Sequence, residues 1–150
     1  YYLPFEEAPE TSDWWKMDNA SRDQKLGPDM HIDVWVKEAE NGLDVRVKTS
    51  GVEGAPWRIE LAFSGVDFLT NDYVDLPLTG SETVVVKQGF AEIGNGKDTL
   101  IVGPCFGEHH FTEGKEDSEG KTPGAATLYL TAYTPFDREI RIRDKVSCYH

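Results

Sequence analysis

The sequence contains few of the residues that hold small domains together covalently or through metals. Its 150 residues include four histidines and two cysteines, Cys105 and Cys148, which permit one disulfide without requiring it. A chain of this length can bury a core of its own and needs neither disulfides nor metals to fold. We therefore expect residues 1–150 to form a single domain that is stabilised by apolar packing.

Long apolar runs are also missing. No stretch approaches the roughly 20 apolar residues that are needed to span a bilayer, and no basic segment followed by an apolar one stands at the start. The chain begins at Tyr1 without an initiator methionine, so we expect a processed chain or a piece of a larger protein. Any targeting signal would then lie outside this sequence.

Basic residues are in the minority. Fifteen lysines and arginines face 27 aspartates and glutamates, which gives a formal net charge of −12. This charge repels phosphate backbones and anionic lipid headgroups, so nucleic acids and membrane surfaces are not expected as partners. It also disfavours highly sulfated polysaccharides unless the arginines gather on one face. Neutral glycans carry no such penalty.

An alternating pattern marks the first regular segment, residues 31–37. Ile32, Val34 and Val36 share one side of an extended chain, and polar residues occupy most of the other. This pattern predicts a half-buried strand, and a second alternating stretch over residues 43–48 predicts its partner.

Asn41 and Gly42 lie between these two stretches. Both residue types accept the positive φ angles of a type I′ turn, so the pair predicts a tight hairpin. A two-residue loop at these positions would place Val36 opposite Val47, with both apolar sets on one face.

Further stretches have the composition of strands. Residues 57–63 alternate, residues 83–93 and 98–104 carry β-branched runs typical of strands covered on both faces, and residues 126–134 and 138–146 close the chain. The turn signal Gly94-Asn95-Gly96 separates two of them.

At least eight short strands with frequent turns predict an all-β fold. We expect an antiparallel β-sandwich, jelly-roll-like, rather than a closed barrel. No window of helical length shows a convincing 3.6-residue period with caps. Residues 1–29 have neither period and are predicted to be an irregular segment that packs over the domain.

The first candidate site surrounds two adjacent histidines, His109 and His110, which stand between Glu108 and Glu113. Nitrogen and oxygen ligands of this kind suit zinc or a related ion. On a regular strand, however, the two imidazoles would point to opposite faces and could not reach one ion. A ligand-contacting or hydrogen-bonding role for one histidine, or an ordinary solvated loop, remain as alternatives to a metal site.

The second candidate site lies in the N-terminal segment. Trp14 and Trp15 cannot both enter one core, and an exposed indole face can stack on a sugar ring. Asn19 and Arg22 would supply hydrogen bonds to sugar hydroxyls, and the neighbouring carboxylates offer calcium as an occupant, although the spacing is not that of an EF-hand. The structural alternative is that one indole closes the end of the sandwich.

The third candidate site is a face of the last hairpin, which we expect to turn around Pro135-Phe136-Asp137. Tyr129 and Tyr133 alternate with apolar residues on one strand, and Arg141 alternates with isoleucines on the other. Together they could bind a sugar or uronate, or they could form a cross-strand ladder.

The end of the chain resembles a known family. The block LIVGPCFGEHHFTEGKE, followed by LYLTAYTPFDREIRI, is similar to the C-terminal β-sandwich of heparinase II/III-like proteins. The resemblance covers about the last third of the chain. It implies an accessory module beside a catalytic domain, exported to an extracellular or periplasmic location, and it carries over no catalytic residues.

We therefore expect a non-catalytic carbohydrate-binding or accessory module of a polysaccharide-active protein. Motifs for a nucleophile elbow, a phosphate loop or a zinc protease helix are absent. The alternatives are a small glycan lyase or hydrolase with His109 or His110 as its base, and a purely structural or protein-interaction domain.

Overall fold

The computed structural model describes residues 29–110, 113–116 and 122–145, and these form eleven strands and no helix. The strands are β1 (His31–Ala39), β2 (Gly42–Ser50), β3 (Pro56–Ser64), β4 (Phe68–Thr70), β5 (Asp75–Pro77), β6 (Thr83–Val85), β7 (Ala91–Gly94), β8 (Thr99–Gly103), β9 (Gly114–Glu116), β10 (Ala125–Tyr133) and β11 (Asp137–Asp144). Across the described ranges nothing resembles a membrane-spanning helix.

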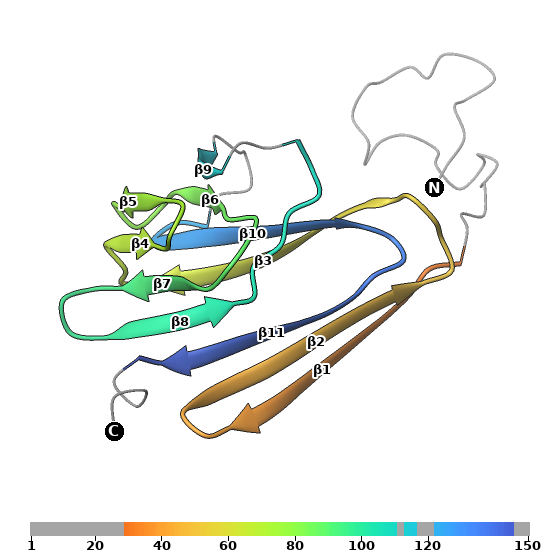
Figure 1. The fold of residues 1–150 in the computed structure, drawn as a ribbon, viewed down its shortest axis with the longest axis horizontal. Coiled ribbons are helices and arrows are strands. Elements are labelled where there is room, and N and C mark those ends of the chain that lie inside the picture. Colours follow the sequence, from red (N-terminus) through yellow and green to blue (C-terminus); the bar gives the residue numbers. More distant parts are fainter. Residues whose placement is uncertain (1–28, 111–112, 117–121, 146–150) are drawn as a thin grey trace, which may run out of the picture.

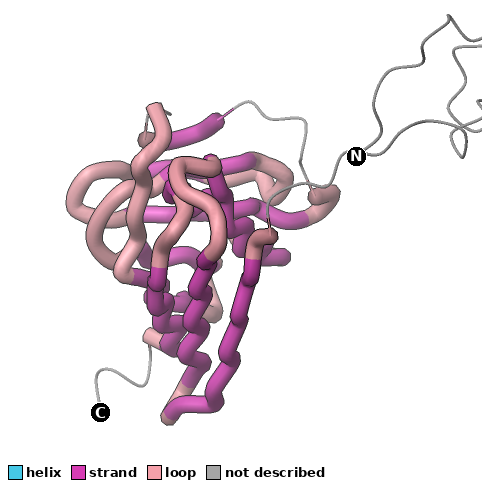
Figure 2. Tube along the Cα trace, turned by 90° about the vertical axis from the view of Figure 1, so that its right-hand side faces the viewer, coloured by secondary structure: helices cyan, strands magenta, loops and turns pink. Residues whose placement is uncertain are grey.

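The strands form two sheets that pack together as a β-sandwich, which confirms the predicted fold class. The large sheet has the order β1-β2-β11-β8-β7-β4-β5, and the small sheet has the order β3-β10-β6-β9 (Figure 1). Neighbouring strands are antiparallel except β6 and β10, which run parallel. In Figure 2 the loops gather at the top of the view and the long strands extend away from them.

The core lies between the two sheets. One face of β10 contributes Leu128 and Leu130, and the large sheet contributes Leu69, Ile93 and Ile140, all of them fully or almost fully buried. Burying a side chain of this size contributes roughly 1.5–3 kcal/mol, so the core depends mainly on these aliphatic contacts. The valines of the run that includes β6 are buried as well, as the continuous β-branched run predicted.

The last two strands do not form a hairpin, and that prediction is wrong. β10 lies in the small sheet and β11 in the large one, so the chain crosses the sandwich between them. The connection between β2 and β3 crosses the sandwich beside the β10–β11 connection. Hydrogen bonds between Thr134 and Ala55 join the two connections: the Thr134 backbone N–H donates to the Ala55 carbonyl, and the Thr134 hydroxyl accepts from the Ala55 N–H. Pro135 lacks a backbone donor, which suits a corner where the sheet ladder stops.

The first hairpin forms with a register that differs from the predicted one. Val36 pairs with Val45 rather than Val47, because the loop consists of Glu40 and Asn41 while Gly42 already belongs to β2. Asn41 has a φ of 62°, and Gly42 serves another purpose: a Cβ there would overlap the Ile142 carbonyl oxygen of β11. The shift is by two residues, so the apolar side chains still share one face.

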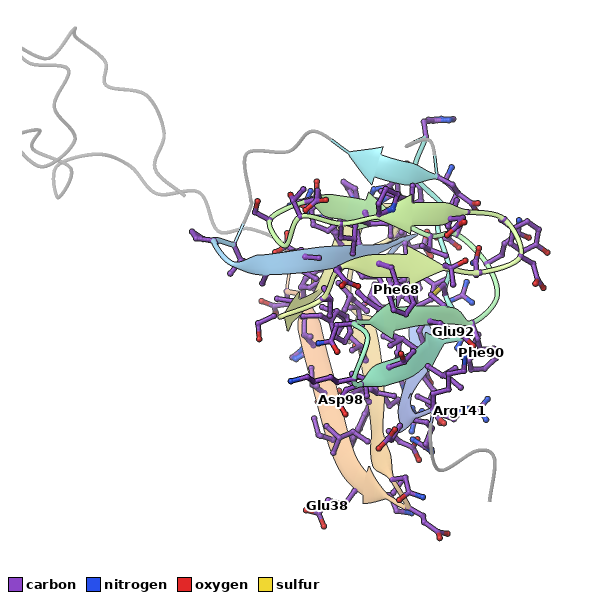
Figure 3. All side chains as sticks on the ribbon, turned by 90° about the vertical axis from the view of Figure 1, so that its left-hand side faces the viewer. Glu38, Phe68, Phe90, Glu92, Asp98 and Arg141 are labelled. Atoms are coloured by element: carbon purple, nitrogen blue, oxygen red, sulfur yellow. The ribbon has the colours of Figure 1, made fainter. Side chains whose placement is uncertain are left out.

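The predicted half-burial of residues 31–37 is also wrong. Ile32, Val34 and Val36 are 46%, 57% and 63% exposed, although they point to the same side as the core. β1 is the edge strand of the large sheet, and among the described strands it packs mainly against β2. Figure 3 shows the β1–β2 hairpin extending beyond the rest of the fold, with Glu38 near its end.

A partly exposed carboxylate holds the turn before β6. Glu82 accepts hydrogen bonds from the backbone N–H groups of Thr79, Gly80 and Ser81 and from the Thr79 hydroxyl. Burial alone would raise its pKa, but these hydrogen bonds together outweigh burial and lower the pKa of Glu82 to about 2.

The Gly42→Ala substitution should destabilise the sandwich by about 1–3 kcal/mol, because a methyl group there forces β2 and β11 apart. Urea denaturation measures the effect. Gly96→Ala is the matched control, since a Cβ at Gly96 meets no atom within 4 Å. Equal stability of the two variants would contradict the assigned role of Gly42.

The Glu82→Gln substitution should cost about 1–2 kcal/mol of stability at neutral pH. Because the pKa of Glu82 falls from 4.5 to about 2 on folding, its contribution is present above pH 4.5 and disappears as the pH falls toward 2. Urea denaturation at pH 7 and pH 2.5 should therefore show a gap between variant and parent that closes at the lower pH. Glu40→Gln, in the exposed first hairpin loop, should show no such change.

Candidate functional site

The histidine stretch completes the edge of β10. β6 pairs with the first half of β10, and Gly107 forms a parallel bridge with Thr131 in the second half. The Glu108 N–H donates to the Thr131 carbonyl over 3.0 Å, and the Glu108 carboxylate accepts from the Tyr133 N–H over 2.8 Å. These contacts cover backbone groups that would otherwise form an open sheet edge.

The two histidines have different environments. The Nε2 of His109 lies 3.0 Å from the Ala132 carbonyl, to which it donates, and its ring packs on Tyr133 with centroids 4.8 Å apart. His110 is exposed. Among the described residues no three His, Cys, Asp or Glu side chains gather closely enough to hold a metal ion. The geometry gives His109 a structural contact and leaves the function of His110 a prediction.

The structure describes only some of the other predicted site residues. Trp14, Trp15, Asn19 and Arg22 lie outside the described residues. Tyr129 is fully buried in the small sheet, where the Arg58 guanidinium stacks over its ring at 4.0 Å.

Tyr133 and Arg141 do not share a face either. Tyr133 is 40% exposed at the end of β10, while Arg141 lies in the large sheet. The predicted tyrosine and arginine face does not form, because β10 and β11 belong to different sheets.

A cleft opens beside the first half of β11. β8 pairs with β11 only from the Arg141–Gly103 pair onward, and Pro104, which lacks an N–H, then leads the chain away. The edge of β11 from Asp137 to Ile140 therefore borders an opening of about 370 Å³ rather than another strand. We call it the arginine cleft; its lining residues are Pro104, Cys105, Phe106, Asp137, Arg138, Glu139 and Arg141.

Two phenylalanines position the arginines of the cleft. Arg138 stacks over Phe106 at 4.8 Å, and Arg141 lies 5.7 Å from the ring of Phe90. Phe106 is almost fully buried, whereas Phe90 is 46% exposed and adjoins Gly103, where a Cβ would come within 2.8 Å of the ring. Figure 3 shows Phe90 and Arg141 on the same side of the molecule.

Carboxylates lie beside these arginines and beside Arg46, and Arg138 pairs with Glu108 at 3.7 Å. Asp137 forms a bidentate pair with Arg46 of β2 at 2.8 and 2.6 Å, which holds the pKa of Asp137 below its usual value. Glu139 approaches Arg141 at 4.0 Å. The cleft thus combines guanidinium donors and carboxylate acceptors with no excess charge, in a chain of net charge −12. The exposed ring of Phe90 does not line the cleft itself but lies beside its Arg141.

One of the cleft residues carries a buried thiol. Cys105 is unpaired and 6% exposed, and its Sγ lies 3.7 Å from the Val102 carbonyl. Burial raises the pKa of the Cys105 thiol to about 12, so the nucleophilic thiolate is scarce at neutral pH. The cleft is therefore equipped for hydrogen bonding and stacking rather than for thiol chemistry.

A second opening of about 380 Å³ lies at another end of the sandwich, between β3 and the β7–β8 turn. Its main polar group, Asn95, is engaged in that turn: its amide oxygen accepts from the Lys97 and Asp98 N–H groups, and its amide nitrogen donates to the Gly65 carbonyl. The predicted turn is confirmed.

Sequence reasoning identified Arg141 but missed Phe90, Phe106 and Arg138. Arg138 shares its side of β11 with Ile140 and so resembles a misplaced polar residue in an apolar row. Phe90 follows Gly89 in a stretch that looks entirely buried. Phe90 meets Arg141 across Gly103, where β8 is still paired with β11, and Phe106 meets Arg138 beyond the point where β8 leaves β11.

Cys105 should resist alkylation in the folded protein. We expect iodoacetamide at pH 7.5 to label a Cys148→Ser variant, in which Cys105 is the only thiol, more than tenfold more slowly in buffer than in 6 M guanidinium chloride, because burial suppresses the thiolate. Mass spectrometry follows the reaction. Equal labelling rates in the two solvents would contradict the buried, protonated thiol.

Comparisons with models of known protein families, with curated proteins and with solved structures gave no match. The resemblance of the last third of the chain to heparinase II/III-like sandwiches stays a prediction.

Proposed function

We propose that this chain is a non-catalytic carbohydrate-binding β-sandwich module of an exported polysaccharide-active protein, and that the arginine cleft receives the sugar. The observation that carries the proposal is the pairing of two phenylalanine-stacked arginines with two carboxylates around one opening of about 370 Å³. That volume lies in the usual range for small-ligand pockets.

The chemistry of the cleft suits a sugar ring. Hydroxyl groups donate to carboxylates such as Glu139 and accept from guanidinium groups such as Arg141, so adjacent hydroxyls can use both. The exposed face of Phe90 offers an apolar surface for the C–H side of the ring. A uronate carboxylate could take the place of Glu139 in pairing with Arg141.

The placement of the arginines removes part of the charge objection to acidic sugars. Four of the six arginines of the chain lie on the adjacent strands β2 and β11: Arg46, Arg138, Arg141 and Arg143. Arg46 and Arg143 are paired with aspartates at 2.6 and 2.7 Å. The cleft can therefore accept a neutral or singly charged sugar, whereas a polysulfated chain would still face the overall charge of −12.

Binding without cleavage agrees with the state of the cleft groups. The lowered pKa of Asp137 keeps it ionised, which is unsuited to a general acid at neutral pH, and the Cys105 thiol stays protonated. We infer that bond cleavage belongs to a neighbouring catalytic domain, with this module holding the glycan.

Titration of the ¹⁵N-labelled chain with neutral and uronate-containing oligosaccharides tests the proposal by nuclear magnetic resonance. We expect saturable shifts of the amide signals of residues 105, 106 and 137–141, with millimolar to micromolar affinity. Arg141→Ala should weaken binding roughly tenfold, because it removes charge-assisted hydrogen bonds and the neighbour of Phe90.

Arg58→Ala is the matched control, because Arg58 also stacks on an aromatic ring but lies on the small sheet. Its affinity should equal that of the parent chain. If no sugar in the panel shifts the cleft residues, or if both arginine variants bind equally well, the proposal fails.

A further inference from the structure

The β1 strand presents an unused sheet edge. It stands at the end of the large sheet and pairs only with β2, so the backbone groups on its other side have no strand beside them among the described residues. Eight of its nine residues are exposed, including Val34, Val36 and Trp35, the last at 46%. A long, apolar edge without proline is a template for pairing with another strand.

The strand β10 shows how an edge can be covered. The edge of β10 is covered by β6 and by residues 107–109. No described segment covers β1 in this way. Figure 1 shows β1 on the outer side of β2, and Figure 3 shows the same hairpin extending away from the other strands.

Backbone geometry restricts how two copies of β1 could pair. Only alternate residues of a strand direct their backbone N–H and C=O groups to a given edge. When two identical edges pair in antiparallel fashion about a two-fold axis, residues of the same alternation must face each other. The axis therefore passes through a residue position and not between two residues. The residues in the middle of β1 that could lie at the axis are Val34, Trp35 and Val36.

Side-chain charges distinguish these three registers. With Trp35 at the axis, Asp33 of each copy lies opposite Lys37 of the other, and Val34 lies opposite Val36. With Val34 or Val36 at the axis, neither Asp33 nor Lys37 meets an opposite charge. Opposite charges directly across a ladder stabilise it, and the Trp35 register makes two such pairs at once.

Trp35 is already held in a defined position. The Arg46 guanidinium lies over its ring at 4.7 Å, and the same arginine is anchored by Asp137. The two indoles would therefore meet next to the axis on the outer face, while Val34 and Val36 of both copies would form one apolar row on the other face.

We propose that two copies of this chain associate through antiparallel pairing of their β1 strands, with Trp35 at the two-fold axis and Asp33 paired with Lys37 of the second copy. The large sheets then become one continuous sheet across the axis. The inference is independent of the proposed glycan site, because Asp33, Trp35 and Lys37 do not line the arginine cleft.

Sedimentation equilibrium over a concentration series tests the association. The parent chain should approach twice its mass of 16.8 kDa at high concentration. Asp33→Lys and Lys37→Asp should each weaken the dimer roughly tenfold or more, since each places like charges opposite one another at two positions. The double variant should regain affinity within about threefold of the parent, because it restores both pairs.

Lys97→Asp controls for the change in net charge, since Lys97 is exposed in the β7–β8 turn and should leave the dimer unchanged. A parent chain that stays monomeric at about 100 μM overturns the proposal and assigns this edge to a different partner. A double variant that dimerises as weakly as the single variants overturns the register.

Cysteine cross-linking measures the register directly. In the Cys148→Ser background, Trp35→Cys should form a disulfide-linked dimer under mild oxidation, because facing residues of an antiparallel pair have Cα atoms roughly 4.5–5.5 Å apart. Asp33→Cys is the control, since it would face Lys37, and should remain uncross-linked. Cross-linking at position 33 and none at position 35 would disprove the assigned axis.

Discussion

The position of one sheet relative to the other depends on a bent two-stranded ribbon that two chain segments form. β2 continues into β3 and β10 continues into β11, and both connections cross from one sheet to the other side by side. Thr49 and Thr134, both buried, close the crossing with backbone and hydroxyl hydrogen bonds to Phe136 and Ala55. Because each of these strands is paired in its own sheet on both sides of the bend, the ribbon sets the position of one sheet relative to the other.

The arginine cleft follows from the same arrangement. β11 enters the large sheet at the bend, while β8 joins it only at Arg141, so the first half of β11 has a paired edge toward β2 and an open edge on the other side. That opening gathers two stacked arginines in an acidic protein. Local pairing with carboxylates and phenylalanines offsets the mutual repulsion of the guanidinium groups that are concentrated there.

The edges of β10 and β1 show two ways in which a strand edge with unpaired backbone groups can be treated. The histidine stretch lies along β10 and uses its backbone and the Glu108 carboxylate to cover that strand, which accounts for charged and polar residues next to a buried strand. β1 has apolar side chains instead, and among the described strands its outer edge is open. A covered edge stabilises the monomer, whereas an open edge of this kind provides a surface for association.

The sequence by itself determined the fold class, most strand positions and the β7–β8 turn, because alternation and turn chemistry are local properties. It also determined that the apolar side chains of the first hairpin share a face of the sheet. The sequence prediction placed Gly42 in the turn, whereas the structure places it in β2 against Ile142. Tertiary structure decided which strands pair, and therefore that β10 and β11 belong to different sheets and that β1 is exposed. It also brought Phe90 and Phe106 to Arg141 and Arg138. Strand pairing depends on contacts between residues that are far apart in the chain, and local sequence patterns do not predict those contacts.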